Sequence, residues 1–529
     1  MADTARGGSG RHAARVAAGI LVTRVLGYVR ERVFAHYFGN GAAADAFRAA
    51  LRIPNALRNL LGEGTLSASF IPVYAALNER ADKGAARALA GAVLGLLLLA
   101  SGVLALVGVA FAPAITAVVA QGFDGPRREL TTVLVRILFP MTGLMVVSAW
   151  CLGILNTHRR FFLPYAAPAL WNVAGIVAMV GAASWLTGQS LPPGEQLYRL
   201  ALALAWGTVA GSLLQIAVQL PACWRLLQGI PFRVSLAPEG VRQVIVAWAP
   251  LVIGAGVAQL SGLVDTFLGS FTGEGGLASL GYAQLIQLLP ISLFGVAVAA
   301  VSLPDLARDA AGTGGAPNDQ LRARIAVGFR RIAFFVVPSA FAFAALGPTI
   351  VGALFQTGRF DADDTILVGG VLAAYGVGLL GQATVKLFAS GFYALRDTRT
   401  PVRIGILSLV VSGVLSWVLM RRFGPAGIAL GSSIGGMLNM VLQLLGLDRR
   451  VGTVLGPANW RTLGLVVAGG LIATALAMGA GHFVAAWRPI PRGIAVLGIF
   501  GVAYGALTLA FRHPDALRAW QSLTGSPAN

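Results

Sequence analysis

Long apolar stretches recur along the whole chain and are separated by short polar gaps. A helix needs about 20 consecutive, mostly apolar residues to cross a bilayer. By this criterion we expect about fourteen membrane-spanning helices. They are centred near residues 25, 57, 100, 143, 174, 210, 256, 290, 338, 378, 411, 435, 472 and 502. The pattern predicts an all-α polytopic membrane protein.

The basic residues of the polar gaps predict the orientation of the chain. If the N-terminus is cytoplasmic, the inward-facing gaps hold roughly 24 of the 40 Lys and Arg residues, and the outward-facing gaps hold about eight. Lys and Arg are enriched in cytoplasmic loops. We therefore expect the N-terminus and the C-terminus on the cytoplasmic side, with a polar basic tail at residues 1–13.

Three pairs of segments repeat at an offset of about 232 to 237 residues. The pairs are 112–124 with 347–361, 154–164 with 391–401, and 70–75 with 302–307. The shared offset predicts two tandem lobes of six spans, which enter the membrane in the same sense and are related by a pseudo-two-fold axis along the membrane normal. We expect an N-lobe at 14–235, a C-lobe at 236–450, a helix pair at 451–515 and a cytoplasmic tail at 516–529. Two such lobes favour transport by alternating access.

Composition narrows the function further. Hydrophobic residues make up 56% of the chain and charged residues 12%, and the mean hydropathy is +0.75. The net charge of +19 is spread over the gaps rather than clustered with aromatic residues, so we expect no nucleic-acid partner. Cys151 and Cys223 show no ligand spacing, and the five histidines are scattered. We expect no resident metal and no cofactor.

One competing class is a membrane enzyme acting on prenyl diphosphates. The acidic cluster Asp361, Asp363 and Asp364 would then hold magnesium. These residues fall in an expected outward loop beside Arg359, which favours a solvated turn. The chain also lacks a G-x-x-x-x-G-K-[ST] phosphate loop, so transport would draw on the membrane potential or on a Na⁺ or H⁺ gradient. We expect a transporter, not an enzyme.

The first two spans carry the candidate site. Arg24, Arg30 and Glu31 lie in the first span, and Asp45, Arg48, Arg52, Asn55 and Asn59 form one polar stripe on the second if its helix continues through Pro54. Pro54, Gly62 and Gly64 predict a kinked or broken helix, which also holds Arg58 and Glu63. The alternative is that these charges snorkel or pair locally, for instance Asp45 with Arg48.

Arg24 argues for a wet cavity. It lies near the middle of its span, where an uncompensated Arg costs roughly 2.5 to 3.5 kcal/mol. Arginine is a permanently charged fork suited to phosphate and pyrophosphate. A cavity lined by arginines therefore predicts an anionic headgroup rather than a cationic drug.

The stretch "TRVLGYVRERVFAHYFGNGAAADAFRAALRIPNALRNLLGEGTLSASFIPVYA" (23–75) resembles the N-terminal signature of the MurJ (MviN) lipid II flippases, a family of the multidrug/oligosaccharidyl-lipid/polysaccharide exporter superfamily. The resemblance continues through 153–172, 293–304 and 389–402. It implies a fourteen-helix protein of the bacterial inner membrane with a V-shaped cavity between two lobes. Such a protein moves the lipid-linked peptidoglycan precursor, lipid II, from the cytoplasmic to the outer leaflet for cell wall biogenesis.

By motif, the required cavity arginines of the family match Arg24, Arg30 and Arg58, and its required acid matches Asp45. We expect Asp45 and, with it, Glu31, Arg52, Asn55 and Glu63 to serve the gate or the local structure. The chain departs from the family at 282–286, where Y-A-D-R-L is replaced by "YAQLI", so the acid and the second-lobe arginine are absent. Lys386 is a possible replacement, and an inter-lobe structural contact is the alternative.

Asp265 is the one acid well inside the seventh span and a candidate Na⁺ or H⁺ site; the alternative is a carboxylate bonded to Ser261 or Thr266. The rival functions are a flippase for another polyprenyl-linked oligosaccharide, which the missing Arg at position 285 favours, a multidrug antiporter of the same superfamily, and a non-transporting scaffold. We expect lipid II and membrane lipids as partners, and a monomer.

Overall fold

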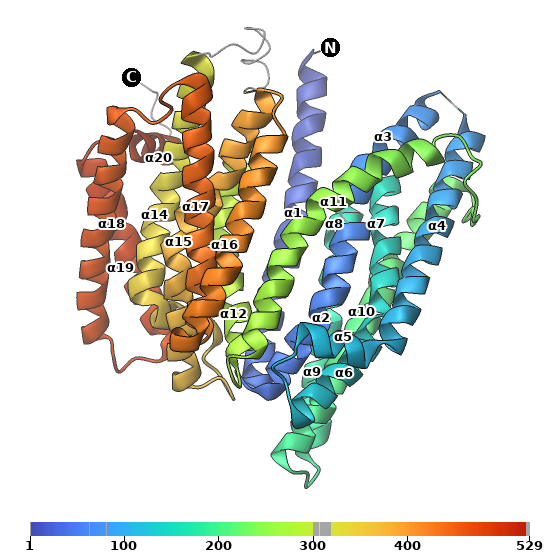
Figure 1. The fold of residues 1–529 in the computed structure, drawn as a ribbon, viewed down its shortest axis with the longest axis horizontal. Coiled ribbons are helices and arrows are strands. Elements are labelled where there is room, and N and C mark those ends of the chain that lie inside the picture. The colour runs from blue at the N-terminus through green and yellow to red at the C-terminus, as the bar shows by residue number, and fades with distance from the viewer. Residues whose placement is uncertain (1, 63, 81, 300–305, 307–318, 525–529) are drawn as a thin grey trace. The chain divides into compact units, whose positions relative to one another are not determined.

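The computed structural model describes residues 2–62, 64–80, 82–299, 306 and 319–524. These residues are almost entirely helical and divide into two compact units. Unit 1 consists of Met1–Gly275 and Thr357–Arg359, and unit 2 of Gly276–Gln356 and Phe360–Asn529. Figure 1 labels the helices.

Unit 1 carries eleven of the labelled helices in its described part. They are α1 (Ala2–Phe38), α2 (Ala42–Leu61), α3 (Thr65–Glu79), α4 (Lys83–Ala110), α5 (Ala112–Val119), α6 (Gly125–Leu138), α7 (Met141–Thr157), α8 (Phe162–Ala166), α9 (Pro168–Thr187), α10 (Pro193–Leu227) and α11 (Val241–Ser270).

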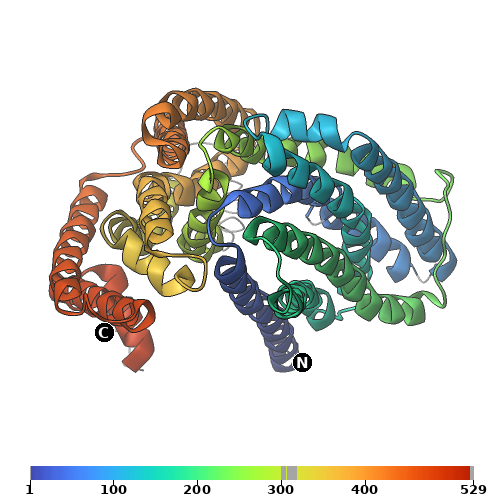
Figure 2. The ribbon, with the colours of Figure 1, turned by 90° about the horizontal axis from the view of Figure 1, so that it is seen from below.

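Unit 2 begins with α12 (Gly276–Pro290), which runs directly into a π-helical turn, η1 (Ile291–Val296). Long helices follow, and α18 and α19 lie side by side and pack on α14 (Figure 1, Figure 2). They are α14 (Asp319–Phe355), α15 (Ala362–Ala394), α16 (Arg399–Phe423), α17 (Pro425–Val451), α18 (Pro457–Phe483), α19 (Pro489–Ala510) and α20 (Pro514–Thr524).

The apolar spans agree with the hydropathy pattern. Within the described residues, 12 helical stretches are long and apolar enough to cross a membrane. The first and seventh expected spans correspond to α1, which carries several charges, and α11, whose apolar stretch is the shorter Val241–Val252. The all-α polytopic fold is confirmed.

The second expected span is interrupted at Gly62 and Gly64, two of the three residues expected to kink or break it. Pro54 lies inside α2 without ending it, and α2 ends at Leu61. The Gly62 N–H donates to the Arg58 carbonyl, which closes the last turn. Gly64, at φ +85°, starts α3 in a conformation that side chains other than glycine rarely adopt. The interruption places Arg58 in the last turn of α2.

Unit 2 packs its helices through small residues. A methyl group added at Gly431 would meet the backbone and hydroxyl of Ser416, and one added at Gly378 would meet Ser433. In a membrane such small pairs let helix backbones approach closely, because apolar burial between helices gains little over lipid. α16 and α15 therefore pack directly against α17.

The first repeated segment ends directly before a helix in each unit. Asp124 precedes α6 in unit 1, and Asp361 precedes α15 in unit 2. Phe123 and Phe360, one residue earlier, are each only 1% exposed. Asp361 also forms a capping box with Asp364, so this part of the acidic cluster is used to start a helix.

The expected lobe limits at 235, 450 and 515 stay predictions, because a compact unit is defined by contacts and a lobe by what moves together. By its contacts, α11 lies in unit 1.

Candidate functional site

The face of α1 that packs on α8 and α9 explains where Arg24 lies. Thr23 donates its hydroxyl to the Tyr165 carbonyl at 2.9 Å, and Asn172 donates to the Thr23 carbonyl at 3.3 Å. The neighbouring position is turned away by about 100° along the helix. The Arg24 side chain is exposed on this unit, among exposed apolar residues that include Leu21 and Val25.

Arg30 and Glu31 form a charge cluster with the second helix. Glu31 Oε1 accepts from Arg30 Nη2 at 2.5 Å, and Glu31 Oε2 accepts from Arg48 Nη2 at 2.9 Å. The Glu31 side chain is only 12% exposed, and the two arginines are 20% and 18% exposed. The Arg30 guanidinium also lies over the Trp171 ring, 4.3 Å from its centroid. The cluster holds two positive charges and one negative charge.

A small cavity of about 30 Å³ lies beside this cluster. It is lined by the three charged residues, by Phe34, Phe47 and Leu51, and by residues of α9 and α10. Trp171 Nε1 is buried and has no hydrogen-bond partner within the described residues. One or two waters fit a space of this size, and a whole lipid headgroup does not.

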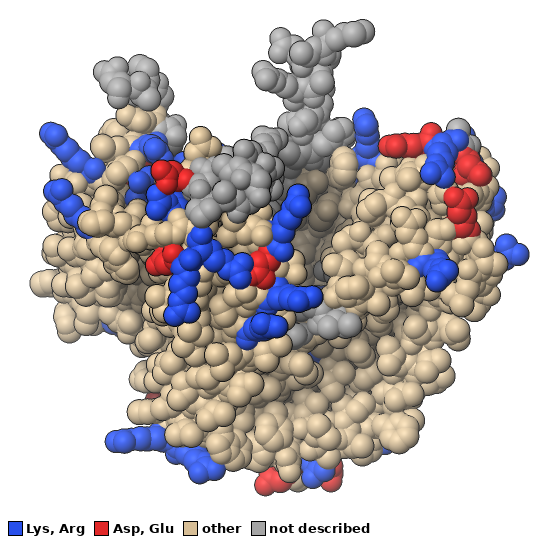
Figure 3. Space-filling model, turned by 45° about the horizontal axis from the view of Figure 1, so that its top comes forward, with Lys and Arg blue, Asp and Glu red and all other residues tan. Residues whose placement is uncertain are grey.

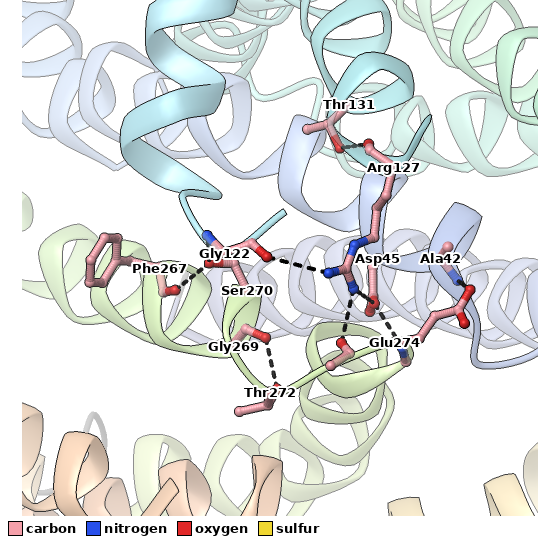
Figure 4. Close-up of polar contacts among 12 residues, drawn as sticks. Ala42, Asp45, Gly122, Arg127, Thr131, Phe267, Gly269, Ser270, Thr272 and Glu274 are labelled. Atoms are coloured by element: carbon pink, nitrogen blue, oxygen red, sulfur yellow. Dashed lines mark hydrogen bonds and ion pairs between the residues drawn. The ribbon is translucent and has the colours of Figure 1, made fainter. Parts of the chain in front are cut away.

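Asp45, in the first turn of α2, is completely buried. Its Oδ2 lies 3.3 Å from Arg127 Nη1 and accepts from the Gly275 N–H at 2.7 Å. Figure 4 shows Arg127 reaching from α6 to the carboxylate and to the carbonyls of Gly122 and Gly273. Its guanidinium also lies over the Phe123 ring, 4.2 Å from the centroid. Asp45 thus fixes three segments of unit 1 together.

Asp45 and Arg48, the example given for local pairing, each have an ion-pair partner on another helix. Asp45 pairs with Arg127, and Arg48 pairs with Glu31. The two side chains are three residues apart in a helix, but each has a geometrically better partner on another helix. Tertiary packing overrides the i,i+3 pair, which contributes only about 0.2–0.5 kcal/mol in an isolated helix.

Two further contacts follow the sequence repeat. The Gly122 N–H donates to the Ser270 hydroxyl at 2.9 Å, so the loop before α6 rests on the end of α11. The Arg359 N–H donates to the His36 carbonyl at 2.9 Å, so the segment before α15 rests on the end of α1. Ala42 N–H also donates to Glu274 at 3.2 Å (Figure 4). These contacts involve the C-terminal ends of α1 and α11 and the start of α2.

Two residues of the polar stripe on α2, Arg52 and Asn59, contact α11. Asn59 Nδ2 donates to Gln259 Oε1 at 3.4 Å. The Arg52 guanidinium occupies the space beside Gly262, where an added methyl group would fall 1.1 Å from Arg52 Nη2. Glycine at position 262 is what lets this arginine lie against the α11 backbone.

Asn55, in the stripe, and Arg58, beside it on α2, are half-buried. Asn55 Oδ1 and Arg58 Nε are buried atoms without a hydrogen-bond partner within the described residues. Glu63 lies outside the described residues. An unpaired polar atom at membrane depth favours contact with water or with a polar ligand.

Asp265 is half-buried on α11, one helical turn after Gly262 and on the same face. Thr266, one of its two expected partners, donates its hydroxyl to the Gly262 carbonyl at 2.8 Å. The Thr266 hydroxyl proton is therefore donated within α11 and not to Asp265. Within the described residues, no group of three or more His, Cys, Asp or Glu side chains could hold a metal ion.

In unit 2, the positions that depart from the family pattern are Gln284 and Leu285, both half-buried. Tyr282, just before them, is fully buried against the rings of Phe355 and Phe360. Lys386 is exposed on α15, one turn after Gln382, which accepts from Gln287. Its role as a replacement charge stays a prediction.

Sequence reasoning did not find Arg127 or Trp171. Arg127 lies at the start of α6, where an arginine in "DGPRRE" reads as a solvated helix start. The available signal was the presence of Asp45 in an expected span, since a carboxylate that becomes buried needs a cation from some other segment. Trp171 gave no signal, because an aromatic residue in an apolar span is ordinary.

The sequence model of the family described as "Lipid II flippase MurJ" matches residues 34–490. The chain belongs to the MurJ family of lipid II flippases. It is 36% identical over 437 residues to the lipid II flippase MurJ of Burkholderia cenocepacia, covering 81% of this chain and 82% of that protein. It is 34% identical to the probable lipid II flippase MurJ of Haemophilus influenzae, covering 81% and 84%.

Solved structures of MurJ and of MATE transporters have a similar fold. A structure described as lipid II flippase MurJ in an inward closed conformation matches with a TM-score of 0.76 at 21% identity, over 94% of this chain and 98% of that one. An inward-facing multidrug resistance MATE transporter matches with a TM-score of 0.66 at 17% identity, over 84% and 98%. The MurJ family is a transporter family, and this chain is a multi-pass membrane protein of it.

Proposed function

We propose that this protein transports lipid II across the bacterial inner membrane, from the cytoplasmic to the outer leaflet, by alternating access. The match of the MurJ family over residues 34–490 carries this conclusion. The sequence supports it, because α1 and α2 carry Arg24, Arg30 and Arg58 among apolar residues. An anionic headgroup suits these arginines.

In this mechanism Arg24, Arg30 and Arg58 neutralise the pyrophosphate of the lipid. Arg24 is exposed, and Arg58 has a buried nitrogen without a partner within the described chain. Arg30 is held by Glu31 and Trp171. It therefore contributes a positive charge at a fixed position, and its guanidinium does not move to bind the phosphate. The polyprenyl tail stays in the surrounding lipid.

Asp45 serves the gate in this proposal. It holds the Gly273–Gly275 segment, which leads directly into α12, against α2 and α6. Release and re-formation of such a buried contact would separate two discrete states, because a buried ion pair is either made or costs several kcal/mol. Arg52 aligns α2 with α11, and Asn55 serves the gate from the same polar stripe of α2.

Transport would be driven by the membrane potential or by a Na⁺ or H⁺ gradient, with Asp265 as the candidate ion site. An ionisable residue in a membrane span is a functional candidate by default. Asp265 lies one helical turn after Gly262, and the Arg52 guanidinium of α2 lies against Gly262. Ion binding at Asp265 would therefore be coupled to the position of α2.

The distribution of charge supports cytoplasmic termini. Lys and Arg gather at the upper end of unit 2 in Figure 3, where α14 and α16 start and α17 ends. The exposed arginines at this end include Arg396, Arg399, Arg403, Arg449, Arg450 and Arg461. An excess of basic residues marks the cytoplasmic side. We propose a monomer whose partners are lipid II and membrane lipids.

The test is complementation of a strain depleted of its lipid II flippase. We expect the wild-type chain to restore growth, and Arg24→Ala and Arg58→Ala to lose it at matched expression, because each removes a charge facing the pyrophosphate. Arg422→Ala, at the exposed end of α16, is the matched control and should complement fully. Growth supported equally by the Arg24 and Arg58 variants would refute their role in binding.

The missing arginine at position 285 favours one second candidate, a flippase for a different polyprenyl-linked oligosaccharide. Failure of the expressed wild type, with growth restored by Leu285→Arg, would favour that candidate. Rescue by the wild type would mean that the arginines of α1 and α2 suffice for lipid II.

A further inference from the structure

A small pocket in unit 2 lies outside the residues proposed for flipping. It is formed by α14, the first turns of α18 and the segment that starts α20, and its volume is about 10 Å³. Its polar lining comes from Arg330, Asn459, Thr462 and His513. This space holds one water molecule or one oxygen atom of a larger ligand.

His513 brings a hydrogen-bond donor to this pocket. Its side chain is completely buried, and its ring stacks on Phe334 with centroids 4.8 Å apart. The backbone N–H of Asp515 donates to Nδ1 at 3.2 Å, so in the neutral ring the proton is on Nε2. Nε2 is buried and has no hydrogen-bond partner within the described residues. A buried N–H without an acceptor calls for a ligand.

The other polar groups of the pocket also suit an anion. Arg330 uses its Nε for Asp515, at 2.9 Å, and within the described chain its two terminal nitrogens make no further hydrogen bond. Asn459 lies in the first turn of α18, where the helix dipole favours negative charge. No acidic side chain is among the residues that line the pocket.

Asp515, the nearest acid, is already shared among cations. Its carboxylate lies 2.9 Å from Arg330, 4.0 Å from Arg331 and 3.8 Å from Arg518. With these three arginines and one aspartate, the surroundings of the pocket keep a net positive charge. An anion would therefore be attracted to the pocket.

Two exposed tryptophans on the helices of the pocket indicate the level of the lipid headgroups. Trp460, beside Asn459, is 56% exposed, and Trp520 on α20 is 54% exposed. Tryptophans in such positions mark the interface between membrane and water. The same end of unit 2 carries the arginines that gather in Figure 3. Basic pockets between membrane helices at this level bind anionic lipid headgroups.

We propose that this pocket binds one phosphate oxygen of an anionic phospholipid headgroup, with His513 Nε2–H, the Arg330 guanidinium and the Asn459 amide as donors. The bound lipid would join α18 and α20 to α14. This site is separate from the arginines of α1 and α2, so it stands whether or not the protein flips lipid II.

The test uses the full-length chain purified in detergent, with lipid binding measured by native mass spectrometry. We expect phosphatidylglycerol to bind about tenfold more tightly than phosphatidylcholine, whose choline is repelled by the surrounding arginines. Asn459→Asp should weaken phosphatidylglycerol binding by about tenfold, because it places a negative charge beside the phosphate. It should not weaken the helix, since an acid in the first turn is favourable.

Ala458→Asp is the matched control, because it adds the same charge in the same turn at an exposed position outside the pocket. It should retain binding within about threefold of the wild type. His513→Phe keeps a ring against Phe334 and removes the donor, and it too should bind phosphatidylglycerol more weakly.

Equal binding of the two lipids, or unchanged binding by Asn459→Asp, would overturn the proposal. Inorganic phosphate at millimolar concentration should leave phosphatidylglycerol bound. If it displaced the lipid fully, the pocket would be a site for free phosphate and the lipid assignment would be wrong.

Discussion

The guanidinium of Arg127 and the carboxylate of Asp45 form an ion pair between residues 82 positions apart in the chain, with a separation of 3.3 Å. Asp45 is completely buried, and the Arg127 side chain is 12% exposed. The same carboxylate oxygen accepts the Gly275 N–H at 2.7 Å. One buried charge therefore joins the starts of α2 and α6 to the segment that leads into α12 (Figure 4).

Arg127→Ala should destabilise the protein by about 3–5 kcal/mol, because it leaves the Asp45 carboxylate buried without its cation. Thermal unfolding in detergent measures the effect. Arg128→Ala is the matched control, since Arg128 is exposed in the same turn, and it should change stability by less than about 0.5 kcal/mol. If the two variants unfolded at the same temperature, the Arg127–Asp45 ion pair would not contribute to stability.

Glu31→Gln should lower both stability and complementation. The carboxylate lies between Arg30 and Arg48, and an uncharged amide would leave two half-buried arginines facing each other. We expect a loss of about 3 kcal/mol, as for other broken buried pairs. A double variant, Glu31→Gln with Arg48→Gln, should recover part of the stability because it removes the repulsion. An unfolding temperature lower than that of the single variant would contradict this account.

Gly262→Ala should displace the Arg52 side chain without unfolding the protein. The added methyl group would displace the Arg52 guanidinium, which is the flexible end of a long side chain. Helix propensity offsets part of the strain, so we expect stability within about 1 kcal/mol of the wild type. Complementation should nevertheless weaken, because Arg52 leaves its place on α11.

The control for this prediction is Gly256→Ala on the same helix, where an added methyl group meets nothing within 4 Å. It should complement as the wild type does. Combining Gly262→Ala with Arg52→Ala should cause no further loss beyond Arg52→Ala alone. Full complementation by Gly262→Ala would show that the position of Arg52 is unimportant.

His158, in the turn after α7, predicts a pH dependence of stability. Burial, reinforced by the charge of Arg160, lowers the pKa of His158 below its usual value. Its Nε2 lies 3.2 Å from the Tyr74 hydroxyl. The unfolded chain then takes up a proton more readily than the folded chain, so this contribution to stability is present above pH ~6.5 and is lost as the pH falls through the folded pKa.

We therefore expect the unfolding temperature of the wild type to fall more steeply than that of His158→Gln as the pH is lowered from about 7 to about 5. The difference between the two curves isolates His158 from other groups, such as His513, whose pKa is also lowered by burial. Parallel curves would exclude a contribution from His158.

Much of the fold follows from local sequence. Apolar stretches predict the spans, and Gly62 and Gly64 predict the break between α2 and α3. The repeat pairs Asp124 with Asp361, and in the structure each directly precedes a helix. These features depend on neighbouring residues or on a shared period, so a single sequence is enough to find them.

The partners of the charged residues did not follow from the sequence. Local spacing suggested Asp45 with Arg48, whereas Asp45 meets Arg127 and Arg48 meets Glu31. Nor did the sequence indicate that Arg52 lies on Gly262 or that Arg30 lies on Trp171. Each of these contacts joins different helices, and helical periodicity carries no information about which faces meet.

The sequence by itself determined that this is a polytopic, all-helical membrane protein with arginines in its first two spans and the signature of its family. Hydropathy, charge and motifs are properties of the sequence, and they do not depend on how the helices pack against each other. Only the tertiary structure decided which charges are committed to each other and which remain exposed. Burial makes an unpaired charge costly, so the packing of distant helices selects the partners.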